Sequence, residues 1–325
     1  MPPELLFHLN CVDTKAQKIN QSFSKRFFYA TIKKSGVYYM NHYYPNEDVL
    51  VEIVSQFNKR NETTIGYLRN QYLGLECYAT AYCKDHNKFL TTRDGRNTGI
   101  NYKFRQALFD AVSSARGVGR LLNSRDVNTL AHFSPFIVDD DSGSSIVHEE
   151  FIESYRCYLS NPLDLRAQKD AFVNLCKLLY LVRCNSAHTG KASFGPNRSK
   201  IERDNSIARL MVNINLLIFN IIMDHPDRKL ACYGTLIDSP YVERFSALDG
   251  KVNGYLETSS EGLTYFTYEL GTGVVSVKLY KSQTAIEFAD IDAYEGNSYE
   301  RIYIPVKCAN DWHVANIYER KYFYE

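Results

Sequence analysis

Residues 220–233, Asn-Ile-Ile-Met-Asp-His-Pro-Asp-Arg-Lys-Leu-Ala-Cys-Tyr, contain the point at which the hydrophobic pattern of the chain changes. Before Asp224, apolar residues recur at the spacing of one helix face, and Pro226 cannot continue that helix. After Pro226, short runs rich in β-branched and aromatic residues take over, which is typical of strands. The apolar helix face consists of Ile207, Leu210, Met211, Ile214, Leu217, Ile218 and Ile221. We therefore expect a helical part followed by a mostly β part.

The helical pattern extends upstream, with start signals at several points. Asn46 before two acidic residues, Asn161 before Pro162, and the Ser199-x-x-Glu202 capping box each predict a helix start. We predict helices at about 46–57, 63–83, 101–122, 148–159, 161–188 and 199–223, a loop at 123–147 and a hairpin at 31–40.

The β part begins at Lys229. We predict strands at 229–233, 251–256, 264–270, 273–280, 301–306 and 313–318, with one helix at about 284–294. The expected fold class is therefore α+β and multidomain. We expect an N-terminal α-helical bundle in residues 1–226, whose first 45 residues form an extension without a predicted role. A small β-barrel is expected in residues 229–325.

Composition narrows the function class. The chain has 325 residues, 45% hydrophobic and 23% charged, which excludes a disordered chain. Its net charge of +1 divides into −5 from Lys229 onward and +6 before it, so a polyanion is a possible partner but not a required one. Eight cysteines without a CxxC pair indicate reduced thiols, and we expect a cytoplasmic protein without a signal peptide. The apolar run from Leu210 to Met223 is too short to span a membrane, and no residue spacing indicates a metal or other cofactor.

One candidate site closes the helix that ends near residue 188, in Leu181-Val-Arg183-Cys-Asn185-Ser-Ala-His188-Thr-Gly-Lys191. A titratable histidine can move protons in phosphodiester cleavage, while an arginine stabilises charge on the phosphate. Five residues separate Arg183 and His188, about 140° around an ideal helix. They converge only if the last turn unwinds or if two copies of the chain meet. The alternative is structural, with Arg183 pairing with a helix end and His188 as a C-terminal cap.

This motif and its flanking apolar helices resemble the HEPN superfamily, in the variant that reads Arg-Asn-Asn-x-x-His-Gly-Gly-Lys. The resemblance implies an RNA-cleaving cleft formed by a homodimer, without a metal. It assigns catalytic roles to Arg183 and His188, a supporting role to Asn185 and an RNA-binding role to Lys191. It also implies tRNA or mRNA as the partner, in a toxin–antitoxin or antiviral setting.

A second candidate site lies in the β part. Tyr233-Gly234-Thr235-Leu236 follows a strand, and a glycine turn there lets backbone N–H groups approach a ligand closely. Glu295 is expected at the junction between a helix and a strand, where functional side chains are common. Partial burial, for which Tyr294, Tyr299 and Tyr303 are candidates, would tune its pKa for acid–base work.

The order of these blocks, with Asp-Ala-Tyr-Glu295-Gly-x-x-Tyr-x-Arg301 and a final Ala-x-x-Tyr318 strand, resembles the γ-glutamylcyclotransferase-like fold. The resemblance implies that Tyr233, Gly234, Thr235 and Leu236 cradle a γ-glutamyl group. It implies that Glu295 takes a proton from the α-amine, which attacks the side-chain carbonyl and releases 5-oxoproline. The alternative is a retained barrel without turnover.

Three functions remain open from the sequence. The first is a metal-independent endoribonuclease whose C-terminal domain binds or modifies a small γ-glutamyl or amine-bearing ligand. The second is a cyclotransferase that uses Glu295, with the helical domain as its dimerisation scaffold. The third is a non-catalytic interaction protein.

Overall fold

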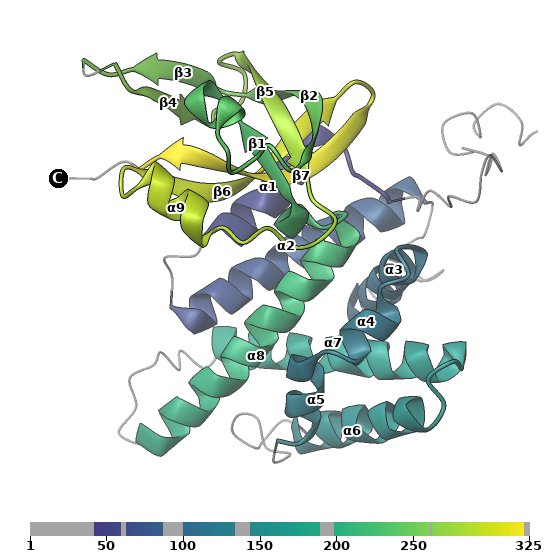
Figure 1. Ribbon diagram of the computed structural model, residues 1–325. Helices are drawn as coiled ribbons and strands as arrows, with labels where there is room; N and C mark the ends of the chain where they lie inside the picture. Colours follow the sequence, from purple (N-terminus) through teal and green to yellow (C-terminus); the bar gives the residue numbers. More distant parts are fainter. Residues whose placement is uncertain are drawn as a thin grey trace, which may run out of the picture. The chain divides into compact units, whose positions relative to one another are not determined.

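The computed structural model describes residues 42–59, 63–86, 100–133, 144–188, 198–260 and 262–321. The predicted hairpin at 31–40 and Lys191 lie outside these residues. Residues from Asn41 to Glu325 form one compact unit, which is helical up to Ile222 and mostly β from Lys229 onward (Figure 1). The α+β fold class predicted from the sequence is confirmed at this level.

The described helices of the first part are α1 (Glu47–Asn58), α2 (Thr64–Asp85), α3 (Ile100–Ser114), α4 (Val118–Leu122), α5 (Arg125–Ala131), α6 (Ser144–Ser160), α7 (Leu165–His188) and α8 (Arg198–Ile222). Asn46 caps α1 as predicted, because its side chain accepts a hydrogen bond from the Val49 N–H at 3.1 Å. The predicted cap at Asn161 is wrong. The helix begins four residues later, where Asp164 accepts from the Arg166 N–H at 2.9 Å.

Two further predictions for this part need correction. The single helix expected at 101–122 is two helices, α3 and α4, which meet at Gly117. A Cβ atom on Gly117 would lie 2.3 Å from the Ile221 side chain, so α8 requires a glycine at this point. The loop expected at 123–147 contains α5, capped by the Ser124 hydroxyl.

The helices share one hydrophobic core that extends to the β part. Phe57 of α1 stacks on Phe219 of α8, with ring centroids 4.0 Å apart. Tyr303 from the β part packs edge-on against the same Phe219 ring at 5.2 Å. Asn58, at the end of α1, forms two hydrogen bonds with the Tyr303 backbone, one to its carbonyl at 2.8 Å and one from its N–H at 2.7 Å. Aromatic packing and the hydrogen bonds of the Asn58 side chain therefore both join α1 to the β part.

Among the described residues, one long apolar segment lies in α8. Asn205–Ile222 is long and apolar enough to cross a membrane by length and composition, so the apolar segment is longer than the predicted run from Leu210 to Met223. However, 56% of this segment is buried inside the protein, as is common for the core helix of a soluble protein. The apolar face of α8 packs in the helical core.

The β part is a closed five-stranded barrel with the strand order β1-β5-β2-β6-β7. Its strands are β1 (Lys229–Cys232), β2 (Ser246–Asn253), β5 (Val274–Lys281), β6 (Tyr299–Cys308) and β7 (Asp311–Arg320). Antiparallel pairs connect the strands, and a parallel contact between Leu230 and Asn316 closes the barrel. The 3-10 helix η3 (Gly234–Asp238) follows β1, and α9 (Ala289–Glu295) precedes β6. The predicted helix at 284–294 is therefore shorter than expected.

A separate hairpin, β3 (Tyr255–Thr258) and β4 (Thr264–Thr267), follows a break in the predicted strand at 251–256. The break is at Gly254, which has φ +135°, a conformation that side chains disfavour. A Cβ atom there would lie 2.2 Å from the Thr267 carbonyl oxygen. Strain and close packing thus coincide at this glycine.

Gly254→Ala is expected to destabilise the protein by about 3 kcal/mol or more, because backbone strain and overpacking add. Gly262→Ala is the matched control. Gly262 also has a positive φ, +82°, but its added Cβ would meet no atom within 4 Å. Gly262→Ala should lower the free energy of unfolding by about 1–2 kcal/mol. Urea unfolding of both variants measures the difference, and equal losses would contradict the packing argument.

Candidate functional site

The structure positions Glu295 at the last residue of α9. The helix ends there because Gly296 adopts a left-handed φ of +73°, and its N–H donates to the Asp292 carbonyl at 3.0 Å. Glu295 is half-buried, and within the described part of the chain its carboxylate has no hydrogen bond or ion pair. An unpaired carboxylate in a partly desolvated position is available to accept a proton.

Asp292, one helical turn before Glu295, fixes α9 to the barrel. The Tyr318 hydroxyl of β7 donates to Asp292 Oδ1 at 2.6 Å, and Arg301 Nη1 of β6 lies 3.3 Å from the same oxygen. The Arg301 guanidinium also stacks over the Phe288 ring at 3.9 Å. These contacts hold the helix end, and with it Glu295, in a defined place on the barrel.

The Tyr233–Leu236 loop follows β1 and begins η3. Gly234 has φ +59°, and both Gly234 and Thr235 are exposed. The first N–H groups of a 3-10 helix have no acceptor within the helix, so they can bind a ligand oxygen. The Tyr233 hydroxyl donates to the Tyr318 carbonyl at 2.9 Å and accepts from the Phe266 N–H at 3.2 Å. The Tyr233 side chain therefore braces the barrel, and the backbone after it is the part open to a ligand.

One small core joins the loop to α9. Leu236 and Ile291 are both buried in it, together with Cys232 at the end of β1. The structure thus brings Glu295 close to the Tyr233–Leu236 loop. The pKa shifts of neighbouring residues also indicate that Glu295 lies close to the loop. Burial raises the pKa of four neighbours, and the negative charge of Glu295 raises it further. These neighbours are Cys232, Tyr233, Tyr299 and Tyr318.

Burial raises the pKa of Glu295 from its ordinary 4.5 to about 7. A carboxylate with this pKa can both take up and release a proton near neutral pH, which suits a general base that later acts as an acid. Perturbed carboxylates of this kind are concentrated at functional sites, although structural ion-pair networks also produce them. Glu295 has no such network around it in the described residues.

Of the three tyrosines predicted to surround Glu295, Tyr299 is close enough for the Glu295 charge to help raise its pKa. The Tyr299 hydroxyl donates to the Thr264 carbonyl at 3.1 Å. Tyr303 was wrongly expected as a neighbour, since its ring packs on Phe219 in the helical core. Tyr294 is 48% exposed and its ring contacts Tyr241.

The second candidate site lies at the end of α7. Arg183 Nη2 is 3.6 Å from Glu76 Oε2 of α2, and both side chains are roughly three-quarters buried. Burial raises the pKa of Glu76, and the Arg183 charge partly opposes that shift. Nothing in the sequence pattern indicated this acidic partner, because it comes from a distant helix.

The helix α7 continues through His188 without unwinding. Of the two ways in which Arg183 and His188 could converge, the unwound last turn is therefore excluded. The positions are about 140° apart around one helix, so a shared site needs a second copy of the chain. The side chains of Asn185 and His188, like Lys191, lie outside the described residues.

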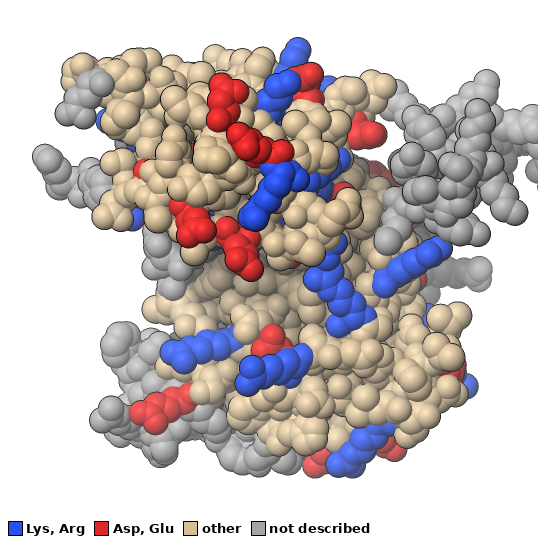
Figure 2. Space-filling model, in the orientation of Figure 1, with Lys and Arg blue, Asp and Glu red and all other residues tan. Residues whose placement is uncertain are grey.

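Surface charge is mixed on the face displayed in Figure 2, where basic and acidic side chains are interspersed. Among the described residues, no group of three or more His, Cys, Asp and Glu side chains could hold a metal ion. No protein-family model, curated protein or solved structure matches this chain.

Proposed function

We propose that the barrel is a cyclotransferase that releases 5-oxoproline from γ-glutamyl compounds. The observation that carries the proposal is the unpaired, half-buried Glu295 carboxylate, whose pKa is raised to about 7 beside the Tyr233–Leu236 loop. This geometry supports the barrel chemistry better than the nuclease, because the Glu295 carboxylate has no ion pair in the described part of the chain, whereas Arg183 is held in an ion pair with Glu76.

In this proposal the loop holds the γ-glutamyl group. Backbone N–H groups of Gly234 and Thr235 bind oxygen atoms of the substrate, and Gly234 permits the close approach. The role of Leu236 is to anchor the loop, since its side chain is buried against α9. The loop and the base are thereby held in one arrangement before the substrate arrives.

Glu295 moves the proton. Its carboxylate takes a proton from the α-ammonium group of the substrate, and the free amine attacks the γ-carbonyl carbon to close a five-membered ring. The bond from that carbon to the leaving nitrogen then breaks as Glu295 returns its proton to that nitrogen, and the ring nitrogen loses its second proton, so that the amine leaves as an ammonium ion. Atoms balance without water or a cofactor, and the products are 5-oxoproline and an amine.

The test is incubation of the full-length protein with γ-glutamyl amino acids and γ-glutamyl amines, with 5-oxoproline measured by mass spectrometry. Matched substrates with an acetylated α-nitrogen are the control, because a blocked amine cannot attack the carbonyl. Release is expected only from substrates with a free amine. No release from any of them by folded protein would contradict the proposal.

A second candidate function is metal-independent cleavage of RNA by the helical part. The observation that favours it is Arg183 at the end of a regular α7, held by Glu76. We propose that two chains pair so that Arg183 of one copy meets His188 of the other, with Asn185 and Lys191 nearby. tRNA or mRNA would be the substrate.

In this second proposal the protein acts in the cytoplasm, in a toxin or antiviral-defence role. The barrel would then bind or modify a small γ-glutamyl or amine-bearing ligand that regulates cleavage. The third function open from the sequence, a non-catalytic interaction protein, predicts neither 5-oxoproline release nor RNA cleavage.

A further inference from the structure

A second polar cluster lies at the end of the barrel away from the Glu295 loop. Lys229 begins β1, whereas the loop follows Cys232 at the other end of the same strand. Those ends are about 10 Å apart at the usual rise of a strand. Lys281, the last residue of β5, is the direct cross-strand partner of Lys229. His313 of β7 lies beside Lys281 in the same cluster.

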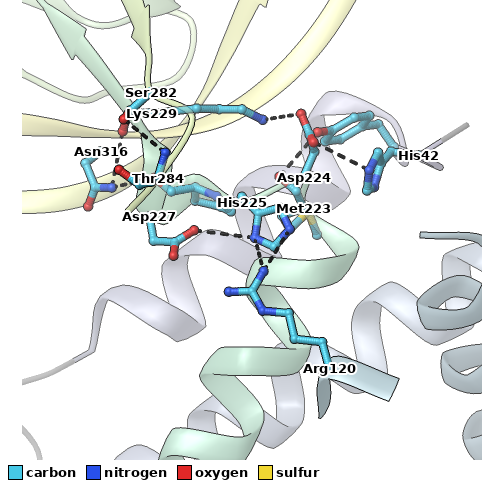
Figure 3. A network of polar contacts seen from close by, with 12 residues as sticks. His42, Arg120, Met223, Asp224, His225, Asp227, Lys229, Ser282, Thr284 and Asn316 are labelled. Carbon is cyan, nitrogen blue, oxygen red and sulfur yellow. Dashed lines mark hydrogen bonds and ion pairs between the residues drawn. The ribbon is translucent and has the colours of Figure 1, made fainter. Parts of the chain in front are cut away.

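Lys229 is almost completely buried, and its ammonium group contacts one carboxylate. Its Nζ lies 2.6 Å from Asp224 Oδ2, and the side chain is 5% exposed (Figure 3). Asp224 Oδ1 lies 3.5 Å from His42 Nε2, so this carboxylate is shared between two groups. Asp224 itself is 39% exposed, which leaves this side of the cluster open to solvent.

Lys281 contacts His313, and this pair shows a surplus of hydrogen-bond donors. Lys281 Nζ is 3.3 Å from His313 Nε2, so the ring nitrogen must accept while the ammonium donates. Burial and the charges of Lys229 and Lys281 lower the pKa of His313 to about 3, which keeps the ring neutral. The ring proton then sits on Nδ1, which is buried and has no partner among the described residues.

Donors therefore outnumber acceptors at this end of the barrel. Among these groups, two ammonium groups and one ring N–H face two acceptors, the Asp224 carboxylate and His313 Nε2, and only Asp224 carries negative charge. Like charges directly opposite on paired strands are destabilising. Of the other carboxylates nearby, Asp227 pairs with His225 at 3.6 Å, whereas Asp249 and Asp311 are exposed and Asp249 pairs with Lys278 at 2.7 Å. What the cluster lacks is a group that accepts several hydrogen bonds and carries negative charge.

Backbone strain marks the same place. Asp224 and His225 both have left-handed φ values, +50° and +56°, which non-glycine residues seldom adopt. Such strain, of order 1–3 kcal/mol per residue, persists only where surrounding contacts hold it, and it is concentrated at ligand sites. Here the Asp224–Lys229 pair and the Arg120 contact to His225 at 3.2 Å hold it (Figure 3).

We propose that Lys229, Lys281 and His313 form a binding site for a small oxyanion, a phosphate or carboxylate group, at the junction of α8 and the barrel. The oxyanion bridges the two ammonium groups and accepts from His313 Nδ1. Asp224 already supplies one anionic oxygen to Lys229, and the ligand supplies those that Lys281 and His313 lack. This site is independent of the chemistry proposed for Glu295.

The test compares sodium phosphate and sodium acetate with sodium chloride at equal ionic strength, using the full-length protein. Either oxyanion should raise the melting temperature by several degrees when it is well above its dissociation constant. Lys281→Met should weaken binding at least about tenfold by calorimetry, a loss typical of a charged hydrogen bond. Lys278→Met is the matched control, because Lys278 is on the same strand but pairs with exposed Asp249.

A second readout is the His313 ring followed by nuclear magnetic resonance. A bound anion favours the protonated ring, so its pKa should rise when the oxyanion is added. A response to phosphate alone would support a site for phosphoryl groups, and a response to acetate as well would support a site for oxyanions in general. Equal stabilisation by chloride, or unchanged phosphate binding by Lys281→Met, would overturn the proposal.

Discussion

Glu295→Gln is expected to lower the rate of 5-oxoproline release by at least about a hundredfold, the usual loss when a general base is removed. Glutamine has nearly the same shape as glutamate but cannot take the proton from the substrate amine. The loss should appear in kcat and not only in KM, because the carboxylate acts on the reacting atoms. Initial rates over a range of substrate concentrations separate the two.

The pH dependence of 5-oxoproline release by the wild-type protein should report the ionisation of Glu295. The base form of Glu295 is the carboxylate, so kcat/KM should rise as pH increases through about 7. A carboxylate with an ordinary pKa of 4.5 would give a flat profile across this range. A flat profile with full activity would therefore contradict the role of Glu295 even if the variant were inactive.

Ionisation of Glu295 should lower the free energy of unfolding over the same pH range in which it raises the activity. The pKa of Glu295 is higher in the folded protein than in the unfolded chain, so folding favours its protonated form. The resulting contribution is present below about pH 4.5 and is lost as pH rises through about 7. Glu295→Gln, which stays neutral, should therefore gain stability over wild type when pH rises from 5 to 8. Urea unfolding at both pH values measures this and shows that the variant is folded.

Glu287→Gln is the matched control for both measurements. Glu287 is exposed and lies just before α9. Its replacement should leave the activity and the pH dependence of stability unchanged. Equal losses in the two variants would point to a general effect on α9 instead of a base at Glu295.

The Glu295 site was largely predictable because its signals are local. A glycine after a short strand indicates a turn with accessible backbone, and Glu295-Gly296 indicates a helix end. Both predictions need only neighbouring residues, and in the structure the loop and α9 are joined by a small core that contains Leu236 and Ile291. The anchor Asp292 was within reach of the same reasoning, since it lies one helical turn before Glu295 on the same helix face.

The unpredicted parts depend on packing between distant segments. The Tyr318 and Arg301 contacts to Asp292 require β6, β7 and α9 to meet. The Glu76 partner of Arg183 requires α2 to cross α7, and no spacing in the sequence encodes that crossing. Tyr303 was misplaced for the same reason, because strand alternation does not say which face of the barrel meets the helices.

Arg183→Ala and His188→Ala are each expected to reduce RNA cleavage by about a hundredfold or more if the helical part is a nuclease. Cleavage is measured in EDTA, because the proposed reaction uses the RNA 2′-hydroxyl and no metal. The products should carry 2′,3′-cyclic phosphate ends. Arg156→Ala is the matched control, since Arg156 is an exposed arginine on α6.

A mixture of the two inactive variants should recover part of the activity. Because α7 is regular through His188, positions 183 and 188 are about 140° apart around the helix, and in the proposal each site combines residues from two chains. After random exchange of chains, half of the dimers are mixed, and each mixed dimer has one intact site of two. Recovery of about a quarter of wild-type activity is therefore expected. No recovery, with mixed dimers shown by mass spectrometry, would mean that Arg183 and His188 do not act across two chains, which would overturn the proposed two-chain site.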